Sequence, residues 1–437
     1  MTELVTKYQQ YEEYKDFDSV FLNEIPASWE VKPLYTLCEF RQGKAHEPFI
    51  DDDGEFICVS ARFVSTQGKS FKRCKVNLTP AKLNDILMVM SDLPNGRALA
   101  RAFFIDDKIK YAVNQRVGVV TAKKVHAKFL YYQLNRNAYF LMFDDGSNQT
   151  NLSNDAFNKY PVLFPSDFEQ KQIANFLDYE TAQIDTLIDK QQTLIQLLKE
   201  KRQAVISHAV TKGLNPDAPM KDSGVEWLGE VPEHWELPKL IHQTSKIGDG
   251  LHSTPQYQDG TGYYFVNGNN LVSGQIVVST TSKEVPEDEY KKHYIYLDNS
   301  SVLLSINGTI GNVARYNNEM VILGKSAAYM NCADSLLPEY LMVLLQSSQA
   351  HYYFDLEVTG TTIYNLSLNS IRQMRVCIPP KQEQSKIHKF CELQQNKYDT
   401  LIEKASTAIR LMQERRTALI SAAVTGKIDV RGWRAPE

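Results

Sequence analysis

The sequence lacks several features that mark whole classes of protein. No CxxC pair occurs among Cys38, Cys58, Cys74, Cys332, Cys377 and Cys391, so neither a zinc site nor a disulfide scaffold is indicated. We expect reduced structural thiols. The N-terminus has no apolar signal core, and no stretch approaches the roughly 18 uncharged apolar residues that a membrane span needs. These absences predict a cytoplasmic protein with no membrane partner.

Motifs for catalysis are also missing from the sequence. It has no G-x-x-x-x-G-K-[ST] phosphate loop. An enzyme that methylates an amino group would need an Asn/Asp-Pro-Pro-aromatic motif, but Pro379-Pro380 lies between Ile378 and Lys381. No paired histidine spacing indicates a metal site. The acidic runs 51–53 and 287–289 could ligate Mg²⁺, but adjacent acids in turn-like sequence are more often solvated loops. The chain is therefore expected to have no catalytic residues and no metal.

The net charge of the chain is small, and the charged side chains are distributed unevenly along it. The total of −4 argues against a simple basic nucleic-acid binder. Residues 56–124, however, hold 13 basic and four acidic side chains, whereas residues 1–55 hold five basic and 13 acidic ones. Residues 238–330 are nearly balanced, with seven basic and eight acidic side chains. The basic block suits a face that follows phosphates, and it equally suits a solvated face without a ligand.

An internal repeat is the strongest feature that is present. At an offset of 206, Lys15 aligns with Lys221 and Trp29 with Trp235, as Pro26 does with Pro232. Later the offset is 214: Asn-Leu-Ser at 151–153 matches 365–367, and residues 169–213 share 20 identities in 45 positions with residues 383–427. The chain of 437 residues is thus two copies of one unit, each with a variable body between constant ends.

The constant C-terminal end of each copy predicts a long helix. Residues 170–208 contain no proline or glycine, and apolar residues recur at steps of three and four. A narrow apolar seam on such a rod favours a partner helix over separate packing, and an internal two-fold would pair the two helices antiparallel. The predicted seam residues are Ile184, Leu187, Ile195, Leu198, Val205, Tyr398, Leu401, Ile409, Met412 and Leu419.

The variable bodies predict mixed α+β domains. Strand-length apolar runs bounded by turn residues occur at 56–59, 86–90, 117–120, 263–266 and 302–306, and helical spacing occurs at 128–140 and 338–353. The predicted organisation is a first body at 14–167, a helix at 168–213, a linker at 214–219, a second body at 220–381, a helix at 382–425 and a tail at 426–437.

Four motifs, in doubled order, carry a family resemblance over essentially the whole chain. They are V-E-W-L-G-E-V-P-E-H-W-E at 225–236, G-x₄-N-L-S at 146–153 and 360–367, F-P-x₃-E-Q at 164–170 with P-P-x₂-E-Q at 379–384, and E-K-R-Q-A-V-I-S-H-A-V-T-K-G at 200–213. The chain resembles the specificity subunit of type I restriction-modification systems. The first copy departs from the pattern, with Phe21-Leu22-Asn23 in place of Trp227-Leu228-Gly229 and about 13 extra residues in front.

The resemblance implies a non-catalytic subunit that reads double-stranded DNA in a phage-defence system. Its two bodies would be target-recognition domains, each reading half of a bipartite, asymmetric sequence. The paired helices would fix the gap and dock two adenine-methyltransferase (modification) subunits. Two motor-nuclease (restriction) subunits would join through that methylating core. S-adenosylmethionine, ATP and Mg²⁺ would belong to these partners, with no cofactor in this chain.

Candidate DNA contacts follow from residue type. Basic side chains would hold phosphates, and Arg, Asn, Gln, Ser or Thr side chains on loops would discriminate bases. The second-body loops 248–254 and 267–270 are also ordinary turn formers. Two other functions stay open, a coiled-coil scaffold that reads no DNA and a self-contained DNA-modification enzyme. The candidates are Lys69, Lys72, Arg73, Arg97, Arg101 and Arg116 in the first body and His252, Asn269, Asn270, Thr309, Arg315 and Thr361 in the second.

Overall fold

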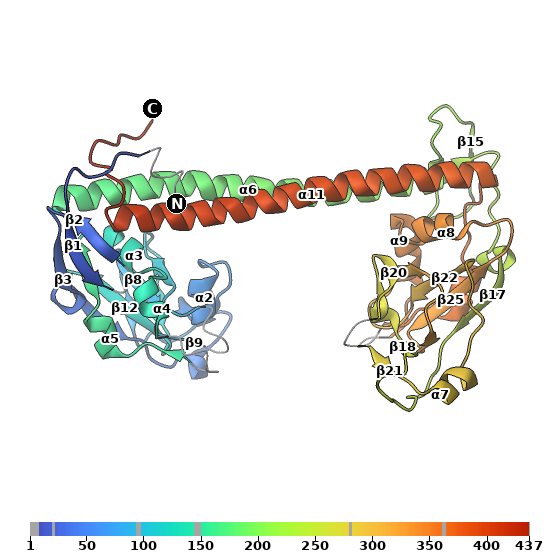
Figure 1. Ribbon diagram of the computed structural model, residues 1–437, viewed down its shortest axis with the longest axis horizontal. Helices are drawn as coiled ribbons and strands as arrows, with labels where there is room; N and C mark the ends of the chain where they lie inside the picture. Colours follow the sequence, from blue (N-terminus) through green and yellow to red (C-terminus); the bar gives the residue numbers. More distant parts are fainter. Residues whose placement is uncertain are drawn as a thin grey trace. The chain divides into compact units, whose positions relative to one another are not determined.

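The chain folds into two compact units in a computed structural model (Figure 1). The structure describes residues 8–19, 22–92, 98–143, 150–278, 282–360 and 364–436. Unit 1 consists of the residues up to Lys190 and those from Ala408 onward, and unit 2 consists of Gln191–Thr407. The domain boundaries predicted from the sequence stay a prediction, because these compact units divide each long helix between them.

Two uninterrupted helices, α6 (Asp167–Lys212) and α11 (Lys381–Val424), contribute one segment each to both units. In unit 1, Arg416 Nε and Nη2 donate to the Asp185 carboxylate at 2.9 and 3.2 Å. In unit 2, Arg202 pairs with Asp399, and both members lie 214 residues from those of the first pair. The repeat in the sequence is therefore a repeat in the contacts between the helices.

The helix segments run antiparallel and bury part of the predicted seam. Gln172, which precedes Asp185, donates to the backbone oxygens of residues 431 and 433, which follow Arg416. Ile184 and Leu419 are buried, whereas Leu187 is 50% exposed and Leu401 is 38% exposed. Successive helical residues are about 100° apart, so only one member of each Leu-Ile pair can face inward, and in unit 1 that member is Ile188. The remaining predicted seam residues, Ile195, Leu198, Val205, Tyr398, Ile409 and Met412, are half-buried.

The body of unit 1 is an α+β fold around two four-stranded sheets, ordered β10-β8-β12-β4 and β6-β5-β11-β7. Helices cover these sheets and connect them to α6. The strands are β1 Tyr14–Ser19, β2 Leu22–Pro26, β3 Glu30–Pro33, β4 Cys38–Gln42, β5 Phe56–Val59, β6 Lys72–Cys74, β7 Pro80–Ala81, β8 Asp85–Val89, β9 Ser91–Asp92, β10 Ala102–Phe104, β11 Tyr111–Val113, β12 Val117–Ala122, β13 Thr150–Asn151 and β14 Pro161–Phe164. The helices are α2 Ala61–Ser65, α3 Ala127–Leu134, α4 Ala138–Leu141 and α5 Asn154–Asn158, with short 3-10 turns at Leu34–Thr36 and Glu47–Phe49.

The body of unit 2 has the same kind of fold, with a six-stranded sheet β17-β25-β22-β23-β20-β19 and a three-stranded sheet β21-β18-β24. Its strands are β15 Met220–Asp222, β16 Glu230–Pro232, β17 Thr244–Asp249, β18 Tyr264–Val266, β19 Leu271–Val272, β20 Gly274–Ile276, β21 Lys283–Glu284, β22 Ser301–Ser305, β23 Val313–Arg315, β24 Val321–Leu323 and β25 Ala327–Cys332. Its helices are η3 Leu240–Gln243, η4 Gly268–Asn270, α7 Glu287–Lys292, α8 Pro338–Leu345, α9 Ser348–Glu357 and α10 Leu368–Gln373.

The two bodies share one topology, although their sequences barely align. The order β4-β12-β8-β10 in unit 1 corresponds to β17-β25-β22-β23 in unit 2. A parallel pair accompanies each sheet, β5 with β11 and β18 with β24. These matches confirm the predicted α+β class with an internal repeat.

Both helices predicted inside the bodies are broken in the structure. Residues 128–140 form α3 and α4, with Arg136 between them at a positive φ of 55°. Residues 338–353 form α8 and the start of α9, and the Ser347 side chain caps α9 by accepting from Ala350 N. Apolar spacing continues through both breaks, so periodicity alone predicted one helix in each place.

The constant motifs have structural roles that recur in both units. Trp29 and Trp235 are buried, and Lys221 Nζ donates to the backbone oxygens of Glu233 and Trp235, as Lys15 does to those of Ala27 and Trp29. The Asn-Leu-Ser motif supplies Ser153 and Ser367, which cap α5 and α10 through their side chains. These residues therefore fix chain geometry rather than contact a ligand.

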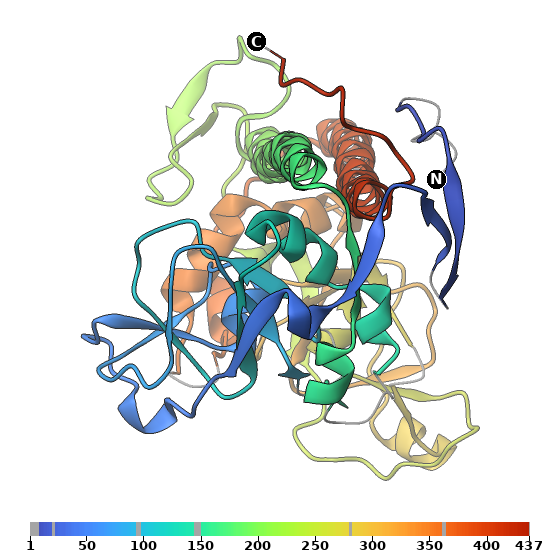
Figure 2. The same cartoon turned by 90° about the vertical axis from the view of Figure 1, so that its left-hand side faces the viewer.

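Unit 1 also brings the two ends of the chain together. Asp429 N donates to Gln9 O at 2.7 Å, and Tyr14 Oη donates to Gly426 O at 3.0 Å. Figure 2, which turns unit 1 toward the reader, shows the C-terminal segment leaving α11 and running back across the two helices. Within the described ranges, no helix is long and apolar enough to cross a membrane, and no cluster of potential metal ligands occurs. The six cysteines are free.

Buried glutamines at the start of both long helices generate a stability prediction. Gln170 is fully buried, accepts from His126 N at 2.8 Å and donates to Pro165 O at 2.9 Å. The Gln170→Met variant leaves a buried N–H and a buried C=O without a partner, which should lower stability by about 2 kcal/mol or more. Urea unfolding followed by circular dichroism measures the effect. The exposed Gln183→Met on the same helix is the control, and equal midpoints for the two variants would contradict the role of Gln170.

Candidate nucleic-acid interface

A basic cleft of about 570 Å³ lies in the body of unit 1. Arg62 on α2, Arg101 directly before β10 and Arg116 directly before β12 line it together with Ser60 and Ser65. Ser60 follows β5 directly and caps α2 by accepting from Phe63 N at 3.3 Å. This cap fixes the turn after β5 that carries Arg62. Three guanidinium groups on strand ends and a capped turn are thus positioned around one hollow.

The acidic side chains of this cleft are bonded to the fold. Glu47 Oε1 accepts from Asn114 Nδ2 at 2.8 Å, and Asp92 Oδ2 accepts from Ala98 N at 2.7 Å. Burial, and next the charge of Arg136, lowers the pKa of Arg101. An arginine remains protonated at neutral pH, so a desolvated guanidinium beside a like charge is stabilised by a bound anion. The cleft therefore favours an anionic ligand.

A second groove of about 490 Å³ shares Arg101 with this cleft. Arg136 from the α3–α4 connection and Arg416 and Lys427 from the end of copy two also line it, together with Tyr132, Tyr139 and Tyr160. Among the described residues that line this groove there is no Asp or Glu. Arg416 is paired with Asp185, but Arg101 lines both hollows and so links Arg62 and Arg116 in one to Arg136 and Lys427 in the other. Such a series of cationic residues is typical of surfaces that follow a nucleic-acid backbone.

The other candidates of the first body lie outside both hollows. Lys69 and Lys72 are exposed, and neither has an ion-pair partner in the part of the chain that the structure describes. Arg73 Nη1 instead donates to Gly54 O at 3.2 Å, and its guanidinium lies over the Phe71 ring. Arg97 lies outside the described residues. Arg101 and Arg116 are the candidates that the fold brings together.

The candidates of the second body divide into exposed residues and residues bonded to the fold. Asn270 Nδ2 donates to Val277 O and Ser282 Oγ, and Arg315 pairs with Glu339 and donates to Asn299 O. His252 Nε2 lies 2.7 Å from Asp249 Oδ2. Asn269 and Thr309 are exposed, and Thr361 lies outside the described residues.

Arg62 and Arg136 are functional candidates that sequence reasoning missed. Arg62 belongs to the basic block 56–124 but is not among the predicted contacts, although Ser60 before it is a helix-capping signal. Arg136 lies within residues 128–140. Because a single helix is predicted there, the turn at Arg136 is not expected from the sequence. A basic residue placed just after a capped turn is the signal that identifies Arg62.

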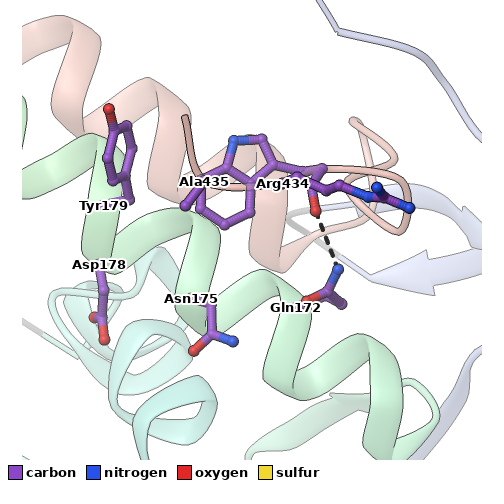
Figure 3. A pocket seen from close by; sticks show the side chains of 7 residues that line it. Gln172, Asn175, Asp178, Tyr179, Arg434 and Ala435 are labelled. Carbon is purple, nitrogen blue, oxygen red and sulfur yellow. Dashed lines mark hydrogen bonds between the residues drawn. The ribbon is translucent and has the colours of Figure 1, made fainter. Parts of the chain in front are cut away.

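A different, largely neutral hollow of about 680 Å³ lies between α6 and the C-terminal segment. Figure 3 shows Gln172, Asn175, Asp178 and Tyr179 of α6 on one side and the residues around Arg434 on the other. Trp433 packs against Phe176 and Tyr179, with ring centroids 5.5 and 5.6 Å apart, and Gln172 Nε2 donates to Trp433 O at 3.2 Å. This hollow results from the packing of the C-terminal segment on α6, and among the described residues that line it Arg434 is the one cation.

Comparison with known proteins agrees with this geometry. The chain matches the family described as type I restriction modification DNA specificity domain over residues 26–197 and 246–409. A Haemophilus influenzae protein named as a putative type I restriction enzyme specificity subunit is 28% identical over 311 residues, which cover 70% of this chain and 74% of the relative. The MjaVIII specificity subunit of Methanocaldococcus jannaschii is 21% identical over 98% of this chain and 99% of its own.

A solved structure shares the fold. It comes from work on complex assembly and conformational transition of the type I R-M system, and it aligns over 92% of this chain and 99% of its own with a TM-score of 0.69 at 14% identity. The match to the family covers well over half of the chain on both sides of the internal repeat. The chain therefore belongs to the type I restriction-modification DNA specificity family, as a specificity subunit.

Proposed function

We propose that this specificity subunit reads a bipartite, asymmetric DNA sequence and docks two adenine-methyltransferase subunits. The proposal rests on one observation, which is that the two bodies have the same strand order but different surfaces. Each unit holds the same body topology and one segment of each long helix, but their surfaces differ, because an arginine-lined cleft lies in unit 1 whereas the sequence of residues 238–330 in unit 2 contains a single arginine. Two readers with equal frames and unequal surfaces suit a target whose halves differ.

Reading and holding DNA would be divided among the basic residues of unit 1. Arg62, Arg101 and Arg116 line a hollow and are held on structured elements, so they suit contacts to base edges or to a phosphate that enters the cleft. Lys69 and Lys72 are exposed and unconstrained, so they suit phosphate contacts that add affinity without sequence information. The scaffold alternative gives no role to this concentration of cations.

Docking of two identical partners would use equivalent apolar positions on the long helices. Leu187 in unit 1 and Leu401 in unit 2 are repeat equivalents, and so are Leu411 in unit 1 and Leu197 in unit 2. All four leucines are exposed. Each unit therefore presents one such leucine from α6 and one from α11, which is what two equivalent partner sites require.

The chemistry would belong to the partners. The modification subunits would carry S-adenosylmethionine and methylate adenine, and restriction subunits recruited through the methylating core would use ATP and Mg²⁺. This chain would contribute recognition, because its polar hollow is lined by three arginines, and the two acids beside them, Glu47 and Asp92, are hydrogen-bonded within the fold.

Loss of one phosphate contact should change affinity and its salt dependence together. Lys72→Ala should weaken binding of the assembled methyltransferase to its target and lower the slope of log K against log salt by roughly 0.9, with the methylated sequence unchanged. Titration by fluorescence anisotropy at several salt concentrations measures this slope. Lys159→Ala, which removes a lysine already paired with Asp155, is the control. An unchanged slope for Lys72→Ala would exclude the phosphate contact.

Charge placed on the exposed leucines should remove partner subunits one at a time. Leu187→Glu should leave one modification subunit bound, Leu401→Glu should do the same, and the double variant should bind none, because each change puts a carboxylate into one apolar contact. Native mass spectrometry counts the bound subunits. Leu356→Glu, at an exposed leucine of α9, is the control. Two subunits on the double variant would show that docking lies elsewhere.

Helix length should set the unread gap between the half-sites. Four alanines inserted at opposed positions of both α6 and α11 add about 6 Å and rotate the distal part by only about 40°. The gap should therefore grow by about two base pairs, with both half-sites kept. Mapping of methyladenine by single-molecule sequencing reads the new target. A gap of unchanged length would contradict the spacer role.

A further inference from the structure

We infer that Arg62 and Asn269 occupy the same base-reading position of the two units, and that they make the two half-sites chemically different, with guanine read by the first and adenine by the second. The inference rests on the proposed function and names which residue reads which half. It supplies a DNA contact for unit 2, whose residues 238–330 are nearly balanced in charge.

Backbone hydrogen bonds establish which positions of the two bodies are equivalent. Asn114 N donates to Val59 O at 3.0 Å in unit 1, and Gly324 N donates to Val266 O at 2.7 Å in unit 2. These pairs equate the end of β5 with the end of β18, and the residue after β11 with the residue after β24. The equivalence does not depend on sequence alignment.

A second pair of equivalent hydrogen bonds matches the residue before β12 with the residue before β25. Met90 N donates to Arg116 O at 2.9 Å, and Ile306 N donates to Ser326 O at 3.0 Å. Arg116 therefore corresponds to Ser326.

A third set of bonds extends the same match to Arg101. Val89 N donates to Arg101 O at 2.9 Å, and Ser305 N donates to Asn312 O at 2.8 Å. The preceding residues, Ala100 and Gly311, both have positive φ, of 58° and 95°. Arg101 therefore corresponds to Asn312.

Arg62 and Asn269 follow from the capped turns after β5 and β18. Ser60 caps α2, and Asn267 caps η4 in a reciprocal capping box with Asn270. Arg62 and Asn269 are each the second residue after the capping residue. Each side chain is exposed, and neither has a side-chain hydrogen-bond or ion-pair partner in the described part of the chain.

Contacts in unit 2 bring its equivalent positions to one place. Gly268 N, next to Asn269, donates to Ser326 Oγ at 2.9 Å, and a Cβ at Gly268 would lie 2.8 Å from the Cβ of Ser305. Ser305 Oγ in turn accepts from Asn312 N at 2.8 Å. Asn269 and Asn312 therefore project from neighbouring loops around Ser305, as Arg62 and Arg101 line one cleft in unit 1.

Ser326 holds the frame of unit 2 and is not a reader. Its hydroxyl accepts from Gly268 N and donates to Asn267 Oδ1 at 3.0 Å, so its hydrogen-bonding groups are in use. Arg116, at the same place in unit 1, instead lines the open cleft. The shared position that is exposed and uncommitted in both units is that of Arg62 and Asn269.

The side chains at this shared position differ in what they can recognise. An arginine fork donates two hydrogen bonds to the O6 and N7 atoms of guanine, whereas an asparagine amide accepts from N6 and donates to N7 of adenine. The same backbone frame would thus read a G·C pair in one half-site and an A·T pair in the other. The difference between Arg62 and Asn269 at one shared position would thus be enough to make the target asymmetric, and differences in the surrounding loops would add to it.

Variants that exchange hydrogen-bonding groups test the assignment. The full chain is assembled with its modification subunits in cells, and methyladenine is mapped for each variant. Arg62→Gln should change one G·C pair to a preference for A·T in one half-site only. Asn269→Asp, which loses the donor to N7, should change one A·T pair toward cytosine in the other half-site only. Arg62→Ala should lower discrimination at its base pair roughly ten- to hundredfold.

Matched controls and a folding check make the outcomes decisive. Lys108→Ala removes an exposed cation from the body of unit 1 and Asn317→Ala removes an exposed amide from the body of unit 2, both outside the reading position, and both should leave the methylated sequence unchanged. Circular dichroism of each purified chain establishes that it is folded. If the unchanged chain directs a bipartite motif but folded Arg62 and Asn269 variants keep it intact, the assignment is overturned. Absence of a bipartite motif with the unchanged chain would instead overturn the proposed function.

Discussion

The constraint on which the rest of the structure depends is the packing of each copy's helix end against the start of the other copy. In unit 2, Gly213 at the end of α6 has a positive φ, and a Cβ there would lie 3.3 Å from Trp235 of copy two. In unit 1, Gly426 after α11 meets Trp29 of copy one at the same distance, and a Cβ would also collide with Pro26. A side chain at either glycine would be strained by its φ and by the aromatic ring beside it. Neither copy therefore completes a unit alone, and both long helices are needed to finish either body.

This packing of each copy against the other explains why constant and variable residues have different roles. The repeated tryptophans and glutamines are buried, and the repeated lysines, which reach the surface, donate to backbone oxygens beside those tryptophans. Among the residues that differ, Arg62 and Asn269 lie on capped turns, and Arg101 and Asn312 lie directly before equivalent strands. Because Arg62 and Asn269 are exposed, we expect substitution at these positions to leave the packing intact and, under the proposed function, to change the target without a change in the fold. The cations of unit 1 and the amides of unit 2 are two such surfaces on one frame.

Much of this architecture could be predicted from the sequence, because repetition and helical periodicity are local signals. The copies, the two antiparallel helices and the α+β bodies followed from them. The inward residue of each Leu-Ile pair could not be chosen, since two neighbouring apolar residues fit the same spacing, and Leu187 proved to be exposed. The equivalence of the bodies was also hidden, because it is carried by backbone bonds that different side chains satisfy equally well. Residue type alone could not separate Asn269, which is exposed, from Asn270, whose amide is bonded to the fold.

The central claim is that one chain with two unlike readers on one repeated frame selects an asymmetric DNA target for methylation. Genome-wide mapping of methyladenine, in cells that carry the modification subunit with and without this chain, tests it most directly. The account predicts methylation that depends on the chain and falls on a non-palindromic sequence of two short specific parts separated by a fixed unread gap. A palindromic or continuous motif, or the same methylation in cells without the chain, would contradict it.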